Sequence, residues 1–149
     1  MRLLIQRVLG ASVTVEQEVV SQIENGLLIF VGFGSGDNPI IFEKIANKVL
    51  QLRVFADEFG KMNQNIQEIA GSLLVISQFT LYGNTQKGNR PSFTEAAPPS
   101  VAQSLYTEWL KILQQKYPRV HAGIFAASMK VSLINDGPVT IWIDSEQWK

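Results

Sequence analysis

The stretch KVSLINDGPVTIWID, residues 130–144, decides how the end of the chain folds. Both of its arms alternate apolar and polar residues, which is typical of β-strands with one buried face. Between the arms, Asn135, Asp136 and Gly137 are ordinary turn residues, so a turn joining two strands is the simplest interpretation. Pro138 complicates it, because proline has no backbone N–H and fits a strand only at its first residue, an edge or a bulge. Local sequence favours the turn but leaves a special role for Gly137 and Pro138 open.

Strand patterns also dominate the first third of the chain. Apolar residues alternate or run together in segments separated by short polar turns, as in β-strands, at 2–9, 12–16, 19–24 and 26–33. A short strand at 52–55 and a longer, very apolar one at 72–81 follow. The sequence therefore predicts a protein built mainly of strands.

Two segments have helical periodicity instead. The first runs from about residue 37 to 52 and carries Pro39 in its first turn. The second begins at 98–100 and reaches about 117, and the residues predicted to face inward are Val101, Leu105, Trp109, Ile112 and Leu113. We therefore expect two helices beside the strands.

Length and composition fit a single domain that spans residues 1–149. The chain is 46% hydrophobic, which is enough for a sizeable core. Many strands and two helices can form either a barrel-like core with outer helices or two packed sheets. We predict an α+β fold in which mixed β-sheets form a barrel-like core and the two main helices pack on one side.

The charge balance limits the partners that we expect. Thirteen basic residues match thirteen acidic ones, so the overall field gives no sequence-independent attraction to nucleic acids or anionic membranes. Any RNA contact must therefore be local, and we expect no DNA partner. No apolar stretch approaches the ~18–20 residues that span a bilayer, and Arg7 interrupts the first apolar run before a signal-peptide core could form. We expect a soluble, cytoplasmic protein.

Side chains suited to chemistry are few. His121 is the only histidine and could act as a base for a serine or threonine hydroxyl, although a lone histidine near a helix end is more often a surface or capping residue. One histidine, no cysteine and scattered carboxylates do not place three metal ligands together. The glycine-rich segment 32–37 lacks the lysine that would reach a phosphate. We predict neither a metal nor a cofactor.

The most informative polar residues end the apolar strand predicted at 72–81. SQFTL, residues 77–81, precedes an eighteen-residue loop rich in glycine and proline, 83–100, and strand ends that lead into loops often carry sites. On this loop Lys87 and Arg90 could hold a phosphate while Phe93 stacks a base. Ordinary strand residues and solvated cations are the simpler interpretation, and composition alone favours it.

Taken together, several segments resemble the D-aminoacyl-tRNA deacylase family. SQFTL and NDGPVT match the two signature motifs of that family. The resemblance covers nearly the whole chain in order and rests on IQRVLGASVTV (5–15), KMNQNI (61–66), SQFTLYG (77–83), KGNRPSF (87–93), AAPP (96–99) and MKVSLINDGPVTIWID (129–144). With both motifs present, a functional role for Gly137 and Pro138 replaces the plain turn.

The resemblance implies a homodimer with its active sites at the interface. In the family, the Gly-Pro pair, here Gly137 and Pro138, has a cis peptide bond and enters the active site of the partner subunit. There its main chain lies where an L side chain would have to go. The implied reaction is hydrolysis of the ester of D-aminoacyl-tRNA, with rejection of the L form, and glycine on mischarged tRNA is an expected second substrate.

The family also implies roles for individual residues. The main chain of SQFTL, with Ser77, Gln78, Phe79 and Thr80 as the catalytic residues, holds the aminoacyl group and the terminal adenosine. Either the Thr80 hydroxyl or the 2′-hydroxyl of the RNA takes part in the chemistry, and we favour the 2′-hydroxyl, because no base is obvious beside Thr80.

Outside SQFTL, we expect Arg7 to brace the Gly-Pro pair and Met129 to line the pocket. Lys87, Arg90 and Phe93 are the expected RNA contacts. The sequence departs from the family pattern at Ala122, Ser128 and Asn89, which bears on affinity and substrate range more than on reaction type.

Two alternatives stay open. One is a hydrolase of small esters or amides with Thr80 as nucleophile and His121 as base. The other is a dimeric RNA-binding module that uses the Lys87 and Arg90 loop without chemistry.

Overall fold

The computed structural model describes residues 1–148. The strands are β1 (Arg2–Val15), β2 (Glu18–Ile23), β3 (Gly26–Gly32), β4 (Phe55–Ala56), β5 (Met62–Gln64), β6 (Ser72–Ser77), β7 (Val120–Ala122) and β8 (Lys130–Asp144). The helices are α1 (Phe42–Gln51) and α2 (Pro99–Lys116), with short 3₁₀ helices η1 (Pro39–Ile41), η2 (Phe79–Tyr82) and η3 (Ser145–Trp148).

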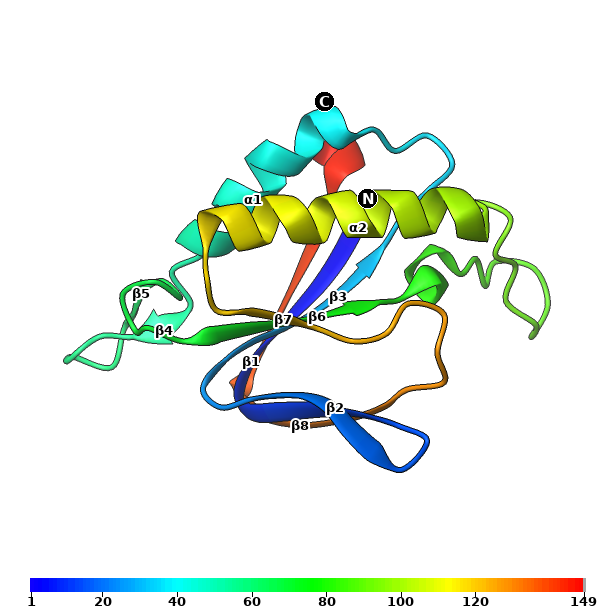
Figure 1. Cartoon of the computed structure of the whole chain (residues 1–149). Coiled ribbons are helices and arrows are strands. Elements are labelled where there is room, and N and C mark those ends of the chain that lie inside the picture. Colours follow the sequence, from blue (N-terminus) through cyan, green and yellow to red (C-terminus); the bar gives the residue numbers. More distant parts are fainter. Residues whose placement is uncertain (149) are drawn as a thin grey trace.

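β1 is the central strand of a six-stranded mixed sheet. It pairs antiparallel with β8 along most of its length and with β3 and then β2 along its other edge. β6 and β7 extend the sheet in parallel beyond β3, and the sheet curls into a nearly closed barrel. Both main helices lie on the same side of it (Figure 1). The predicted α+β fold with a barrel-like core and two helices on one side is confirmed.

The apolar runs of β3 and β6 are explained by burial on both faces of the sheet. Successive side chains of a strand point to opposite faces. In β6, Leu73 and Val75 pack in the larger cluster with residues of α1 and α2, whereas Leu74 and Ile76 pack with Val8 in a second cluster. A strand covered on both faces needs no polar alternation, and this gives β6 a rigid position from which the chain continues to the site.

The turn that local sequence suggested at 135–138 is not formed, because 130–144 is one strand that pairs with β1 on both sides of these residues. The four residues 136–139 form a bulge opposite Arg7 alone, since the paired positions on either side are Val8 with Asn135 and Gln6 with Thr140. Such a bulge admits a glycine and a proline without a reversal of the chain. Similarly, the predicted strands 2–9 and 12–16 are the single strand β1.

Three further predictions need correction. The strand predicted at 72–81 ends at Ser77, and η2 follows as a 3₁₀ turn. The strand predicted at 52–55 is reduced to β4, Phe55–Ala56. In α2, Val101 is 46% exposed and Ala102 is buried in its place, because the helix turns a slightly different face to the sheet than the sequence pattern indicated.

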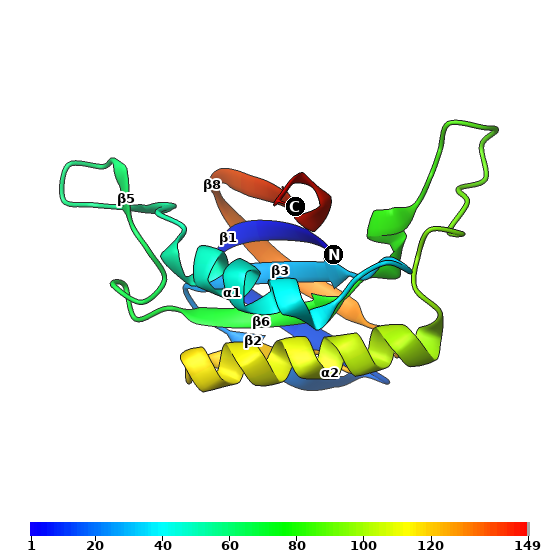
Figure 2. The same cartoon turned by 90° about the horizontal axis from the view of Figure 1, so that it is seen from above.

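Two segments project from opposite ends of the molecule. One is the β4–β5 hairpin, and the other is the coil at 83–98 that precedes α2, as both views show (Figures 1 and 2). Among the described residues, no helix is long and apolar enough to cross a membrane.

Candidate active site

The end of β6 places the SQFTL residues at the surface. β6 is held between β3 and β7, and the Gln78 N–H continues the ladder by donating to the Val31 carbonyl at 2.7 Å. The chain then turns into η2, where Phe79 is 56% exposed and Thr80 is also exposed. As the first two residues of a short helix, they have backbone N–H groups without partners inside that helix. The rigid strand therefore presents a short stretch of polar main chain.

A cavity of about 690 Å³ opens beside this turn. It lies between the strand ends of β3 and β6, the coil that leads into α2, and the segment before β8. Its lining consists of Val31, Gly32, Phe33, Ile76, Ser77, Gln78, Phe79, Phe93, Thr94, Ala96, Ala97, Pro98, Pro99, Ala102, Phe125, Ala126, Ala127, Met129 and Val131. Its size is within the range of small-molecule sites, and most of its wall is apolar.

The cavity brings together five of the predicted residues. Ser77, Gln78 and Phe79 come from the SQFTL turn, Phe93 from the coil and Met129 from the approach to β8. The rings of Phe79 and Phe93 meet edge to face with centroids 5.0 Å apart, which is a favourable aromatic arrangement. Two exposed rings thus form an apolar rim at the mouth of the cavity.

Three other predicted residues do not line the cavity. Thr80 is exposed, and its hydroxyl accepts a hydrogen bond from Gln78 Nε2 at 2.6 Å. Lys87 and Arg90 are exposed on the coil. Neither cation is part of the cavity wall, whereas Phe93, the third predicted RNA contact, is.

The cavity wall contains no titratable side chain among the residues that the structure describes. His121 is exposed on β7, where it pairs with Leu74, three residues before Ser77 on β6. At about 3.3 Å per residue along a strand, the position of His121 is displaced from that of Ser77 by about 10 Å along the strand direction. No hydrogen bond in the described part of the chain joins His121 to a serine or threonine, so the arrangement that a hydroxyl nucleophile needs is not assembled.

The Gly137–Pro138 peptide bond is cis, as the resemblance implied. Gly137 has φ +141°, a conformation that L side chains rarely adopt, and both residues are exposed. The Asn135 side chain spans the bulge, because its Oδ1 accepts from the Val139 N–H at 2.8 Å and its Nδ2 donates to the Val139 carbonyl at 3.1 Å. This clamp holds the Gly-Pro pair out from the strand.

Arg7 braces the same bulge from β1. Its Nε donates to the Asp136 carbonyl at 2.9 Å and lies 3.3 Å from the Asp136 carboxylate. A second guanidinium nitrogen donates to the Val54 carbonyl. Arg7 thus ties the segment before Gly137 to the segment before β4.

The Gly-Pro pair and the cavity of the same chain lie in different places. Through Arg7 and Val54 the pair sits beside the β4 end of the molecule, whereas the cavity is bounded by the 83–98 coil at the other end (Figure 2). Neither Gly137 nor Pro138 lines the cavity. The two signature motifs therefore do not meet within one chain.

Several residues that line the cavity were not predicted from the sequence. Phe33 follows β3, and Phe125, Ala126 and Ala127 belong to the irregular segment between β7 and β8. Ala126 has φ +60°, so the chain makes a sharp local turn there. The segment 121–129 carries no periodicity, and only its small residues hinted at a close approach. The described residues contain no group of three or more His, Cys, Asp or Glu side chains placed to hold a metal ion.

Comparison with known proteins gives consistent results over almost the whole chain. The family model described as D-Tyr-tRNA(Tyr) deacylase matches residues 4–144. A relative from Saccharophagus degradans, named D-aminoacyl-tRNA deacylase, is 54% identical over 96% of this chain and 99% of its own length. A relative of the same name from Thermosipho africanus is 49% identical over 99% of both chains.

Solved structures support the fold. A structure named c-Myc DNA Unwinding Element Binding Protein superposes with a TM-score of 0.92 at 38% identity, covering 97% of this chain and 99% of that one. A probable eukaryotic D-amino acid tRNA deacylase has a TM-score of 0.85 at 15% identity, with 95% and 97% covered, and shares the fold. From the family match and these relatives, the chain belongs to the D-Tyr-tRNA(Tyr) deacylase family and is an enzyme of that family.

Proposed function

We propose that this chain hydrolyses the ester bond of D-aminoacyl-tRNA, releasing the free D-amino acid and tRNA. Water supplies the hydroxyl of the released carboxylic acid, and the 3′-oxygen of the terminal adenosine leaves with a proton. Family membership and the SQFTL turn at the cavity support this reaction. The expected role is chiral proofreading in translation in the cytoplasm, with glycine on mischarged tRNA as a second substrate.

The observation that carries the mechanism is a cavity without a titratable side chain in its described wall. An aminoacyl ester is already labile beside its neighbouring 2′-hydroxyl, and it needs positioning more than a strong protein nucleophile. We therefore assign activation of the water that attacks the ester carbonyl to the 2′-hydroxyl of the substrate, rather than nucleophilic attack to Thr80. The main chain of Ser77 to Thr80 holds the aminoacyl group, and the N–H groups of Phe79 and Thr80 stabilise the negative charge that develops on the carbonyl oxygen.

We further propose that the chiral filter is completed by a second copy of the chain. The exposed Gly137–Pro138 pair of the partner subunit would enter the cavity beside the substrate Cα. Because this wall is main chain, it cannot move aside as a side-chain rotamer can, and an L side chain meets a severe clash. Glycine has no side chain to reject, which makes it a substrate. Clamping by Asn135 and Arg7 supports this role, because it fixes the pair at the surface of each subunit.

The RNA contacts complete the proposal. Phe79 and Phe93 at the cavity rim suit stacking with the terminal adenine. Lys87 and Arg90 on the adjoining coil suit the phosphates that follow it. We do not extend the DNA contact in the name of one structural neighbour to this chain, because its balanced charge gives no general attraction to a duplex.

The deciding experiment follows ester loss from D-tyrosyl-, L-tyrosyl- and glycyl-tRNA with purified protein, each against an enzyme-free control. We expect loss from the D-tyrosyl and glycyl forms only. Equal loss of the D and L forms would reject the chiral filter, and tRNA binding without ester loss would reject the enzyme in favour of a binding module. Sedimentation of the protein checks the dimer in the same preparation.

A further inference from the structure

The main chain of the proposed site lies on a turn with little internal support. η2 is a single 3₁₀ turn, held by the bond from the Leu81 N–H to the Gln78 carbonyl at 3.3 Å and from the Gly83 N–H to the Thr80 carbonyl at 2.9 Å. Short 3₁₀ turns have poor hydrogen-bond geometry. The coil that follows, 83–98, contains only isolated bridges. Contacts with the sheet must therefore set where this turn stands relative to the cavity.

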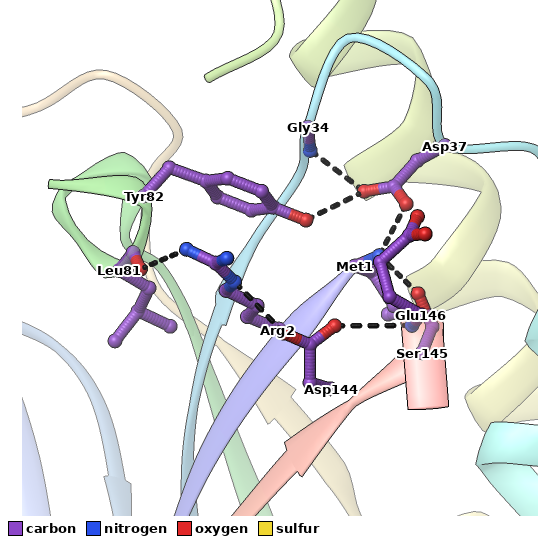
Figure 3. A network of polar contacts seen from close by, with 9 residues as sticks. All are labelled: Met1, Arg2, Gly34, Asp37, Leu81, Tyr82, Asp144, Ser145 and Glu146. Carbon is purple, nitrogen blue, oxygen red and sulfur yellow. Dashed lines mark hydrogen bonds and ion pairs between the residues drawn. The ribbon is translucent and has the colours of Figure 1, made fainter. Parts of the chain in front are cut away.

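Arg2 supplies such a contact from the first position of β1 (Figure 3). One terminal guanidinium nitrogen donates to the Leu81 carbonyl at 3.1 Å, while Nε donates to Asp144 Oδ2 at 3.1 Å. The guanidinium carbon also lies 4.3 Å from the centroid of the Tyr82 ring. Arg2 is paired with Asp144 on β8 and with Gly32 on β3, so its backbone is held between two strands of the sheet. A planar, charged fork is well suited to hold a carbonyl and a carboxylate together.

The Tyr82 ring forms the other side of this clamp. It packs where two glycines leave room, because a Cβ on Gly32 would come within 3.3 Å of the ring and one on Gly34 within 2.7 Å. Its hydroxyl donates to Asp37 Oδ2 at 3.2 Å. Burial, and after it the Asp37 charge, raise the pKa of Tyr82 above its usual range, so the hydroxyl stays a donor at neutral pH.

Asp37 joins this clamp to the body of the protein. Its Oδ2 also accepts from the Gly34 N–H at 2.6 Å, and its Oδ1 contacts the Met1 amino group, which in turn contacts the Ser145 hydroxyl (Figure 3). The end of η2 is thus held by β1, by the end of β8 and by the loop before α1. Arg2, Tyr82, Asp37 and Asp144 do not line the cavity.

We propose that Arg2 is a positioning residue for the deacylation reaction: it fixes the η2 turn, so that the Phe79 and Thr80 N–H groups stand where the oxyanion forms. This inference rests on the proposed function, which assigns the reaction to that turn. Groups that stabilise a transition state must be placed to within a fraction of an ångström, and a shift of about 1 Å can cost about 100-fold in rate. Substrate binding, in contrast, is spread over the cavity, its rim and the RNA contacts.

The test compares kcat and KM for D-tyrosyl-tRNA in Arg2→Gln and Arg2→Lys with the unaltered protein. Arg53→Gln is the matched control, because Arg53, two residues before β4, also donates to a carbonyl, that of Asn63 on β5 at 2.8 Å, at the end of the molecule opposite the 83–98 coil (Figure 2). We expect Arg2→Gln to lower kcat about 10- to 100-fold with KM changed less than about threefold, and Arg53→Gln to leave both unchanged. Arg2→Lys keeps the charge without the planar fork and should recover part of the rate.

Amide hydrogen exchange gives a second readout, since we expect faster exchange at Leu81 and Gly83 in Arg2→Gln. A folded Arg2→Gln with unchanged kcat, or with a raised KM alone, overturns the inference, as does an equal loss in Arg53→Gln. Should Arg2→Gln fail to fold, an unchanged kcat in Arg2→Lys overturns it instead. An unaltered protein without D-specific ester loss refutes the proposed function itself, which separates the two failures.

Discussion

Replacing Gly137 by alanine tests the proposed chiral filter at its narrowest point. A Cβ on this residue would lie 2.7 Å from Val139 Cγ2, 2.9 Å from the Val139 nitrogen and 3.2 Å from an Arg7 guanidinium nitrogen. To restore ordinary van der Waals contact, the closest pair must separate by about 0.7 Å. The backbone φ of +141° adds strain for an L side chain, of about 1–3 kcal/mol.

This strain falls on exposed residues of a bulge outside the core, and it acts against the contacts that Asn135 and Arg7 make with that bulge. We therefore expect the bulge to move rather than the protein to unfold. A strain of about 1–3 kcal/mol corresponds to a fall in Tm of about 2–12 °C for a chain of this size. A displaced wall either admits the L side chain or obstructs the D substrate. Both outcomes lower the ratio of kcat/KM for D- over L-tyrosyl-tRNA, by about tenfold or more.

The assay measures deacylation of both tyrosyl-tRNAs by Gly137→Ala, with Gly60→Ala as the matched control. Gly60 also has a positive φ, +75°, but a Cβ there meets nothing within 4 Å. The control should lose a comparable amount of backbone stability and keep the D-to-L ratio. An unchanged ratio in Gly137→Ala, or an equal fall in Gly60→Ala, would refute the reasoning.

Three further predictions concern the chemistry, the core and the pH dependence of stability. Thr80→Val should hydrolyse D-tyrosyl-tRNA at a single-turnover rate within about tenfold of the unaltered protein. With a D-tyrosyl-tRNA that ends in 2′-deoxyadenosine, the rate of the unaltered protein should fall at least about 100-fold. The reverse pattern would restore Thr80 as the nucleophile. Leu74→Ala should lower the free energy of unfolding in urea by about 2–5 kcal/mol, because Leu74 is fully buried. The control Ile40→Ala, at an 86% exposed position, should change this free energy by less than about 0.5 kcal/mol. Similar losses in the two variants would contradict the assigned core. Burial raises the pKa of Tyr106 above its usual range, so its contribution to the free energy of unfolding is complete below about pH 10 and is lost above that pH, where the unfolded chain ionises. Urea unfolding between pH 9 and 11 should therefore show a fall in the free energy of unfolding that is smaller in Tyr106→Phe. An equal fall in both proteins would argue against this role of Tyr106.

The sequence predicted the strands and helices better than the connections between them. Continuous apolar runs such as 73–76 are buried on both faces, and their composition already indicates that environment. The bulge at 136–139 was not predicted as such, because turn residues are common to turns and bulges, and only pairing with β1 distinguishes the two. For the same reason η2 was predicted as strand, since Leu81 continues the apolar alternation although the chain has already left the sheet.

The site was predictable as motifs but not as an arrangement. SQFTL lies at the cavity, yet the residues themselves gave no sign that Gly137 and Pro138 lie apart from that cavity in the same chain, which the family resemblance alone implied. Arg2 carried no signal, because an arginine at the start of a strand is ordinarily a solvated residue. Its role depends on Tyr82 and Asp144, which are far from it in sequence and lie next to it only in the folded chain.

The cavity without titratable side chains has a practical consequence for inhibitors and chemical probes. Fluorophosphonates, chloromethyl ketones and alkylating agents trap a reactive serine, histidine or cysteine. The described cavity wall contains no histidine, and the chain contains no cysteine. The one serine of the described wall, Ser77, has no histidine bonded to it. Screening by covalent labelling would therefore pass over this enzyme. Under the proposed mechanism, compounds that block this cavity would act by shape and by hydrogen bonds to main-chain atoms, as a non-hydrolysable D-aminoacyl adenosine would.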